Sequence, residues 1–226
     1  MALGRGAVHR HDDAPAPAGD PYAPVVKLIG LTGGIGSGKS SVSALLAERG
    51  AVIVDADAIT RDLQRPGEPV FASIVERFGP DVVADDGTLD RPALASIAFG
   101  DTAALADLNA LVHPAVGAAI AAAIEAHAGT DAVVVLDVPL LVESTNPRSD
   151  LAGLLVVDCP VDVAVARLVS QRGMDEADAR ARIARQASRE QRLERADHVI
   201  DNAGPPEALP ALVAEAWAWI EGLPAR

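Results

Sequence analysis

A glycine-rich segment that follows an apolar run places the strongest constraint on how this chain can fold. The run, Val25–Leu31, leads into the sequence GGIGSGKS at residues 33–40, and a segment with helical character, Ser41–Arg49, follows. The spacing G-x-x-x-x-G-K-S is that of a phosphate-binding P-loop, and a predicted strand before it and a predicted helix after it strengthen the match. We therefore expect a strand–loop–helix unit that binds the phosphates of a nucleoside triphosphate.

Each residue type in this loop has a physical role in holding a phosphate. Glycines lack a Cβ, so the backbone can adopt positive φ and wrap closely around an anion. Successive N–H groups converge on that anion, and the helix dipole adds partial positive charge. We expect Lys39 to contact the β- and γ-phosphates and the Ser40 hydroxyl to bind Mg²⁺. The motif alone does not distinguish GTPases, ATPases, motors and small-molecule kinases.

Hydrophobic runs alternate with helical patterns along the chain, which favours an α/β fold with a parallel sheet and crossover helices. The predicted strands are Val25–Leu31, Ala51–Val54, Ala132–Val138, Leu154–Asp158 and His198–Ile200. Between the second and third strands, residues 58–131 exceed one crossover. The helices predicted there are Ala58–Gln64, Glu68–Phe78, Arg91–Phe99, and one from Thr102 to about His127. We expect a P-loop NTPase fold whose helical insertion is large enough to hold a second substrate.

The composition limits the partners of the chain. Its formal net charge of −13 argues against nonspecific binding to nucleic acid or to anionic membranes. Cys159 is the single cysteine, so no intrachain disulfide is possible and a reducing cytoplasm is expected. We expect Cys159 to be a small, half-buried filler rather than a nucleophile. The longest apolar runs, Ala115–Ile124 and Ala132–Val142, fall short of the ~18 residues of a membrane span. Residues 1–24 lack the apolar core of a signal peptide, and we expect a disordered leader.

Acidic side chains follow the second and third predicted strands, where ligands bind in open α/β sheets. Asp55 and Asp57 come at the end of the second strand. One of them can cap the helix that starts near Ala58, and the other can orient an acceptor hydroxyl and take its proton. Asp137 follows four apolar residues, which is a Walker-B-like context for an aspartate associated with Mg²⁺.

The segment Asp175–Arg195 is basic, although the chain as a whole is acidic. Read as one helix at 100° per residue, it places Arg182, Arg185, Arg189 and Arg192 on one face. Two interpretations are open: a solvated helix with ion pairs to neighbouring glutamates, or a lid whose arginines close on phosphates. The P-loop and the negative net charge favour the lid.

Taken together, these residues resemble the dephospho-CoA kinase family. The matching segments occur in order as LTGGIGSGKSS (31–41), VDADAITR (54–61), DGTLDR (86–91), LNALVHP (108–114), VPLLVE (138–143) and QASREQRLERADHVIDNAG (186–204). A P-loop alone is unspecific, but this ordered set is specific and extends over roughly residues 27–220.

The resemblance implies a P-loop kinase of the nucleoside-monophosphate-kinase type, with a domain over residues 25–226. Its parts are a nucleotide core (25–57, 132–165 and 196–226), a helical CoA-binding insertion (58–131) and a helical lid (166–195). The implied reaction moves the γ-phosphate of ATP, with Mg²⁺ as cofactor, onto the ribose 3′-hydroxyl of dephospho-CoA. The products are CoA and ADP, and the reaction is the final step of coenzyme A synthesis.

The resemblance also implies roles for individual residues. It favours Asp57 over Asp55 as the catalytic carboxylate, with Lys39 and Arg172 as the other catalytic residues. The dephospho-CoA contacts are Asp57, Leu140 and His113, although His113 can also be a helix-breaking packing residue. The metal site is Ser40, with Asp137 acting through water. The implied ATP-binding residues are Gly34, Ile35, Gly36, Ser37, Gly38, Lys39, Ser40, Ser41, Arg189, Asn202 and Gly204.

Two departures from the family pattern are visible. Gly173 and Met174 follow Arg172, where family members often carry an acidic residue, and this leaves the detailed lid geometry open. Ser41 stands where many P-loop kinases have Thr, which is a mild change.

Two rival functions remain to be weighed. A nucleotide-dependent switch would lack acceptor chemistry, and its GTPase form would carry an N-K-x-D motif, which the sequence does not contain. A kinase for another small alcohol would share the P-loop and the lid but would not need the insertion. No heptad pattern favours an obligate oligomer, so we expect a monomer. Its expected partners are ATP and dephospho-CoA, without nucleic acid or membrane.

Overall fold

Five parallel strands form one sheet in the order β2-β3-β1-β4-β5. The computed structural model describes residues 26–139, 141–142 and 150–224. The strands are β1 (Lys27–Gly33), β2 (Val52–Asp55), β3 (Val133–Asp137), β4 (Gly153–Asp158) and β5 (His198–Asp201). The predicted five-stranded parallel sheet is confirmed, and every strand end lies within about two residues of its predicted position. The predicted leader, residues 1–24, lies outside the described residues.

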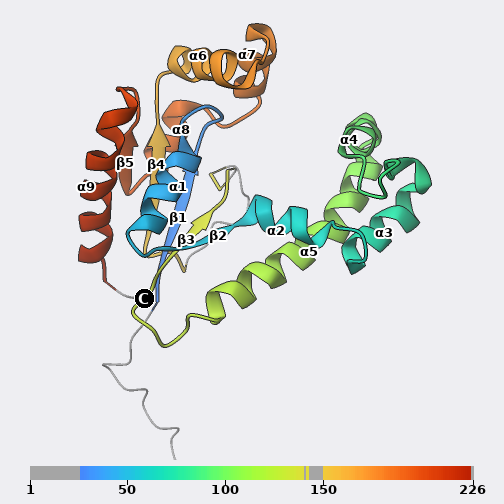
Figure 1. Ribbon diagram of the computed structural model, residues 1–226, viewed down its shortest axis with the longest axis horizontal. Helices are drawn as coiled ribbons and strands as arrows, with labels where there is room; N and C mark the ends of the chain where they lie inside the picture. The colour runs from blue at the N-terminus through green and yellow to red at the C-terminus, as the bar shows by residue number, and fades with distance from the viewer. Residues whose placement is uncertain (1–25, 140, 143–149, 225–226) are drawn as a thin grey trace, which may run out of the picture.

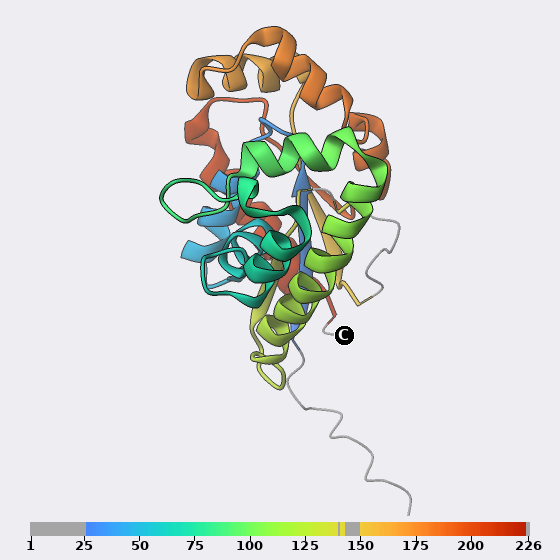
Figure 2. The ribbon, with the colours of Figure 1, turned by 90° about the vertical axis from the view of Figure 1, so that its right-hand side faces the viewer.

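Helices cover both faces of the sheet and extend beyond it (Figure 1). They are α1 (Lys39–Glu48), α2 (Ala56–Leu63), α3 (Pro69–Phe78), α4 (Arg91–Gly100), α5 (Thr102–Glu125), α6 (Val161–Arg172), α7 (Glu176–Ala184), α8 (Arg189–Arg195) and α9 (Leu209–Gly222), with the short 3₁₀ helices η1 (Pro80–Val82) and η2 (Pro206–Ala208). Helices α2 to α5 form a group that projects away from the sheet, and α6 and α7 lie above the carboxyl ends of the strands (Figures 1 and 2).

The main core lies between the sheet and helices α1 and α9. Alternate residues of β1, such as Ile29 and Leu31, point to this face and are fully buried. Val42 of α1 and Val213 of α9 pack against them and are also fully buried. Burying one such side chain contributes about 1.5–3 kcal/mol, so this layer holds the P-loop firmly at the end of the central strand.

A second cluster lies on the other face of the sheet, where the C-terminal part of α5 covers it. Leu28, Val134 and Leu136 are buried there, and Ile120 and Ile124 of α5 pack against them. The strands therefore present apolar side chains to both faces, as expected of a buried parallel sheet.

The predicted insertion has an apolar cluster of its own. Ile74 of α3 and Val82 of η1 are fully buried in it, and Leu94 of α4 and Val112 of α5 are buried beside them. Because α5 contributes to this cluster with its N-terminal half and to the sheet cluster with its C-terminal half, it connects the insertion to the core.

Helix α5 is also long and apolar enough, by length and composition alone, to cross a membrane. Its best 18-residue window has a mean hydropathy of 1.4, and 6% of that window is buried. The expectation that no segment approaches the length of a membrane span was based on uninterrupted apolar runs and is wrong by this measure. The helix reaches this length because alanines count as apolar and His113-Pro114 does not end it. Its larger side chains pack in the two clusters described above.

The basic segment Asp175–Arg195 is not one helix, and this part of the prediction is wrong. Helix α7 ends at Ala184, and α8 begins at Arg189. Ser188 starts α8 with a capping box in which its side chain accepts from the backbone of Gln191 and the Gln191 side chain accepts from the Ser188 N–H. The four arginines consequently do not share a face, since Arg182 and Arg185 are exposed whereas Arg192 is buried.

The insertion cluster allows a direct test of how the insertion is stabilised. Ile74→Ala removes a fully buried side chain from a cluster formed by α3, α4, α5 and η1. We expect the free energy of unfolding to fall by about 2–5 kcal/mol, because transfer free energy is lost and a cavity remains. Urea unfolding measures this change. The matched control is Glu76→Ala, on the exposed side of the same helix, for which a change above about 0.5 kcal/mol would contradict our description of this face.

Candidate active site

The candidate site lies where the carboxyl ends of the central strands meet. Asp137 at the end of β3 is in register with Leu31 of β1 on one side and with Asp55 at the end of β2 on the other. The P-loop leaves β1 at the same edge, as expected for open α/β sheets. An open cavity of about 500 Å³ lies there, and its lining residues are Gly33, Gly34, Ile35, Gly36, Gly38, Lys39, Ser40, Asp55, Asp57, Arg61, Asp137, Pro139, Arg172 and Gln186.

Lys39 and Asp137 form an ion pair across the cavity floor. Asp137 is only 4% exposed. Burial raises the pKa of its carboxyl, and the hydrogen bond and charge of Lys39 oppose that rise, as does a hydrogen bond involving Ser43. The P-loop lysine therefore neutralises a buried carboxylate that would be costly to leave alone.

Asp55 and Asp57 have different tasks at the start of α2. Asp55 is the N-cap, and its Oδ1 accepts a hydrogen bond from the Ala58 N–H at 2.9 Å. Asp57 lies in the first turn of α2 and lines the cavity. The expectation that one of the two caps the helix is confirmed, and the cap is Asp55. Among the described residues Asp57 has no hydrogen bond or ion pair, so its carboxylate is available to a ligand.

Two glycines of the P-loop are required by backbone geometry. Gly36 and Gly38 have φ of +80° and +90°, which L side chains rarely adopt. A Cβ on Gly36 would lie 2.8 Å from the carbonyl oxygen of Ala164 in α6. The first turn of α6 therefore packs directly against the P-loop at Gly36 and leaves no room for a side chain there.

The segment after β5 holds the P-loop through buried hydrogen bonds. The Asn202 Nδ2 donates to the Ser37 carbonyl at 2.7 Å, and Asn202 is 6% exposed. Arg167 of α6 donates from Nη2 to the Asn202 carbonyl at 2.8 Å and from Nη1 to the Ser37 carbonyl at 3.5 Å. Asn202, which we expected to contact ATP, therefore binds the loop that receives the phosphates, and it is not among the residues lining the cavity.

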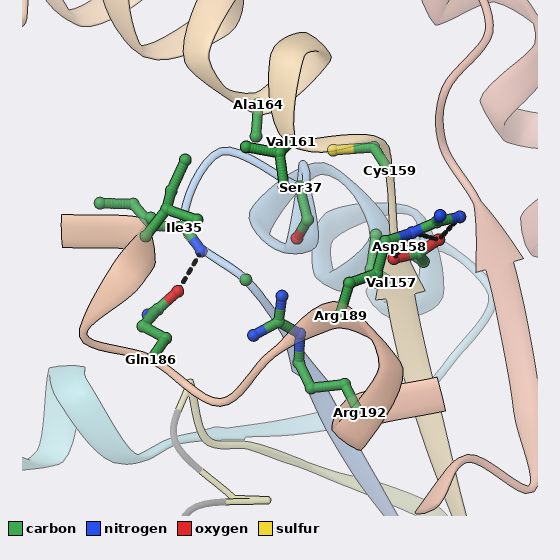
Figure 3. Close-up of a pocket in the computed structure, with 12 residues that line it drawn as sticks. Ile35, Ser37, Val157, Asp158, Cys159, Val161, Ala164, Gln186, Arg189 and Arg192 are labelled. Atoms are coloured by element: carbon green, nitrogen blue, oxygen red, sulfur yellow. Dashed lines mark hydrogen bonds and ion pairs between the residues drawn. The ribbon is translucent and has the colours of Figure 1, made fainter. Parts of the chain in front are cut away.

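The predicted lid, residues 166–195, reaches the site at two points. Arg172, the last residue of α6, is exposed and lines the cavity. Gln186, between α7 and α8, lines it too and accepts a hydrogen bond from the Ile35 N–H at 2.9 Å (Figure 3). The sequence predicted Arg172 at the site but not Gln186.

Behind the P-loop lies a second, smaller cavity of about 20 Å³, shown in Figure 3. Arg189 lines it and forms an ion pair with the buried Asp158 at the end of β4, with an Nη2–Oδ2 distance of 2.7 Å. Arg192 is 8% exposed and donates a hydrogen bond to the Ala187 carbonyl. It also lies close to Gly34: a Cβ on Gly34 would be 2.7 Å from the Arg192 Nη2. Arg189 thus lies against Asp158 and not in the larger cavity.

The remaining predicted site residues that the structure describes fall outside the larger cavity. Ser37 is buried and lines the smaller one, and within the described part of the chain its hydroxyl has no hydrogen-bond partner. Ser41 and Gly204 are exposed and do not line the larger cavity. His113 is exposed in the middle of α5, which continues through Pro114, so the helix-breaking packing interpretation is wrong. Leu140 lies outside the described residues.

Sequence reasoning missed Arg61, Pro139 and Gln186 as lining residues. Arg61 is four residues after Asp57 and therefore on the same side of α2, a spacing that could have indicated it. Gln186 gave no such signal, because its contact with Ile35 joins segments 151 residues apart. Cys159 is buried, more fully than the half-buried filler we expected, and burial raises the pKa of its thiol.

The cavity offers the oxygen ligands that a Mg²⁺–nucleotide complex requires. Mg²⁺ is commonly bound by one or two carboxylates together with substrate phosphates, not by a dedicated cage of protein ligands. Ser40 and Asp137 both line the cavity next to the P-loop and supply a hydroxyl and a carboxylate. The described residues contain no cluster of three or more His, Cys, Asp or Glu side chains able to hold a metal alone. Residues at the site therefore fit a metal that arrives with a nucleotide.

The fold and the cavity together define a P-loop kinase: a P-loop, carboxylates at the ends of strands and an arginine at the end of α6 line one cavity. The family model for dephospho-CoA kinase matches residues 27–207. The chain belongs to the dephospho-CoA kinase family.

Individual relatives agree with this assignment. The chain is 54% identical to the dephospho-CoA kinase of Streptomyces avermitilis over 191 residues, covering 84% of this chain and 92% of that one. It is 51% identical to that of Thermobifida fusca, covering 84% and 94%. The crystal structure of TT1252 from Thermus thermophilus superposes with a TM-score of 0.72 at 33% identity, covering 87% of this chain and 97% of that one.

Asn202 provides a test of how the P-loop is held. Asn202→Ala removes the buried amide that donates to the Ser37 carbonyl. We expect the free energy of unfolding to fall by about 1–3 kcal/mol, since a buried acceptor loses its closer partner, and the KM for ATP to rise. Asn202→Asp keeps the shape but replaces the donor with an acceptor, so its effect should be at least as large. The control is Glu207→Gln, exposed in the same connection, and a wild-type KM for ATP in both Asn202 variants would contradict the holding role.

Proposed function

We propose that this protein transfers the γ-phosphate of ATP to the ribose 3′-hydroxyl of dephospho-CoA, giving CoA and ADP. One observation carries the proposal: in a chain of this family, a single cavity brings together the P-loop lysine, three strand-end carboxylates and a lid arginine. The reaction is the final step of coenzyme A synthesis.

The donor side of the cavity is formed by the P-loop. Its backbone N–H groups and the start of α1 favour anionic groups, and Lys39 at the start of α1 pairs with Asp137 at the sheet edge. A bound phosphate takes Lys39 away from Asp137, whose carboxylate then faces the cavity beside Ser40. Ser40 and Asp137 are the residues that would hold Mg²⁺, and this ion supplies charge neutralisation at the phosphates when bound.

The acceptor side is formed by the start of α2. Asp57 is our candidate for the carboxylate that orients the 3′-hydroxyl and accepts its proton as the bond to phosphorus forms. Asp55 is the poorer candidate because its carboxylate accepts the Ala58 N–H and faces Arg61.

The lid completes the site from the opposite side. Arg172 lines the cavity and has an exposed side chain, so it can follow the transferring phosphoryl group when the lid excludes water. The roles first expected for Arg189, Asn202 and Gly204 in binding ATP, and for His113 in binding dephospho-CoA, stay predictions.

The setting of the reaction follows from the same features. The buried free thiol of Cys159 and the use of ATP support a cytoplasmic location. The net charge of −13 supports small-molecule partners rather than nucleic acid or a membrane surface.

The proposed function is tested by following ATP consumption with and without dephospho-CoA in the presence of Mg²⁺. We expect ADP to form only with the acceptor, together with a product one phosphate heavier than dephospho-CoA by mass spectrometry. Fragmentation of that product locates the phosphate on the ribose. ATP binding without this product would exclude the reaction and favour another hydroxyl acceptor or a nucleotide switch.

Asp57→Asn tests the proposed base. We expect kcat to fall by about 10²–10⁴-fold, the usual contribution of a positioned general base, while the KM for ATP changes little because Asp57 lies on the acceptor side. Steady-state kinetics with both substrates measures these constants. Asp62→Asn removes the same charge from an exposed position on the same helix and should keep wild-type kcat. Wild-type turnover in Asp57→Asn would show that this role is misassigned.

A further inference from the structure

The charges that line the larger cavity are unusual for a site that must bind anions. Three carboxylates, those of Asp55, Asp57 and Asp137, face a space that must receive two phosphate-bearing nucleotides. Among the described lining residues only Lys39, Arg61 and Arg172 carry positive charge. With so few cations, we ask which phosphate group each one can bind, and its position in the cavity is the guide.

Two of these cations lie on the side of the donor. Lys39 belongs to the P-loop and pairs with Asp137 at the sheet edge. Arg172, at the end of α6, lines the cavity and is the cation that the proposed function assigns to the transferring phosphoryl group. Arg61 differs because it lies on α2, the first helix of the insertion, on the side of the cavity where Asp57 faces the acceptor.

The spacing of Asp57 and Arg61 suits the two ends of a nucleotide. They are four residues apart on α2, which places both on one face, separated by about 6 Å along the helix axis. The 3′-hydroxyl and the 5′-carbon of a nucleotide are attached to adjacent carbons of the ribose ring, C3′ and C4′, and point to opposite faces of the ring. A ribose that presents its 3′-hydroxyl to Asp57 can thus direct its 5′-phosphates toward Arg61.

We propose that Arg61 binds the 5′-diphosphate of the acceptor nucleotide and so orients its 3′-hydroxyl toward Asp57. This inference rests on the proposed function and adds a specificity-determining residue to it. A guanidinium suits the task because its planar donors bind phosphate oxygens in pairs. The acceptor class this favours is a nucleoside carrying a 5′-diphosphate, with weaker binding of the nucleoside alone.

The existing partner of Arg61 does not hold it in place. Its Nη2 lies 4.0 Å from the Asp55 Oδ2, and the two side chains are 58% and 43% exposed. Exposed ion pairs of this kind contribute at most about 1 kcal/mol. Asp55 already accepts the Ala58 N–H as helix cap, so Arg61 can turn to a phosphate without leaving a buried group unpaired.

Three variants separate this role from a structural one. Arg61→Ala removes the cation, and Arg61→Lys keeps the charge but loses the paired donors. Arg65→Ala is the matched control, because Arg65 follows one turn later, pairs with Asp62 at 2.6 Å, is 71% exposed and does not line the cavity. Calorimetric titration with dephospho-CoA, in the presence of a non-hydrolysable ATP analogue, measures acceptor binding without turnover.

We expect Arg61→Ala to weaken dephospho-CoA binding about 10- to 100-fold, as for loss of a hydrogen-bonded charge. Arg61→Lys should recover part of this loss, and Arg65→Ala should bind as the wild type does. The affinity for the ATP analogue and the melting temperature should stay unchanged in all three. Wild-type acceptor binding in Arg61→Ala, or an equal loss of ATP affinity, would overturn the inference. A lower kcat with unchanged acceptor binding would also overturn the inference, because it would indicate that Arg61 positions Asp57 and does not bind the acceptor.

The binding measurement also separates this inference from the proposed function. A wild-type protein that binds dephospho-CoA but makes no CoA would overturn the proposed function, while the Arg61 variants would still report on binding. A wild-type protein that makes CoA while Arg61→Ala binds the acceptor normally would overturn only the inference. A wild-type protein that does not bind dephospho-CoA would overturn both.

Discussion

The parallel direction of all five strands determines where chemistry can take place in this chain. It brings the ends of β1, β2 and β3 to one edge, so that the P-loop, Asp55 and Asp137 meet although they are far apart in sequence. Carboxylates gathered at such an edge repel each other and lose hydration. The pair between Lys39 and the buried Asp137 offsets that cost, and it uses the same cation that a phosphate requires.

The contacts between residues 186–192 and the P-loop are the second organising feature. Gln186 accepts the Ile35 N–H on one side of the loop, and Arg189 pairs with the buried Asp158 on the other. Arg192 fills the space beside Gly34, where a Cβ would lie 2.7 Å from its Nη2. A movement of this segment relative to the sheet would have to break these defined polar contacts.

Local sequence patterns made most of the fold predictable. The features that the sequence did not reveal depend mainly on contacts between segments far apart in the chain. The P-loop and the strands depend on neighbouring residues, so spacing alone revealed them. The break between α7 and α8 was also local, since Ser188 and Gln191 form a capping box, but the regular spacing of arginines concealed it. In the site, Lys39, Asp57, Asp137 and Arg172 follow motifs and line the cavity as expected. Gln186 does not, because its role depends on a contact that only the folded chain creates.

An acidic protein can bind two polyanions if its few cations have carboxylate partners that the ligand can replace easily. Lys39 and Arg61 each lie beside an aspartate, and both line the same cavity. The pair between Lys39 and the buried Asp137 reduces the cost of burying that carboxylate and positions the lysine before a ligand arrives. Arg61 has only a long, exposed ion pair with Asp55, which a ligand can replace at little cost. In the proposed reaction, phosphates replace these partners, and the Asp137 carboxylate is then available to a metal ion that arrives with the nucleotide. Carboxylates that seem unfavourable for anion binding are therefore compatible with the proposed binding of two phosphate-bearing nucleotides.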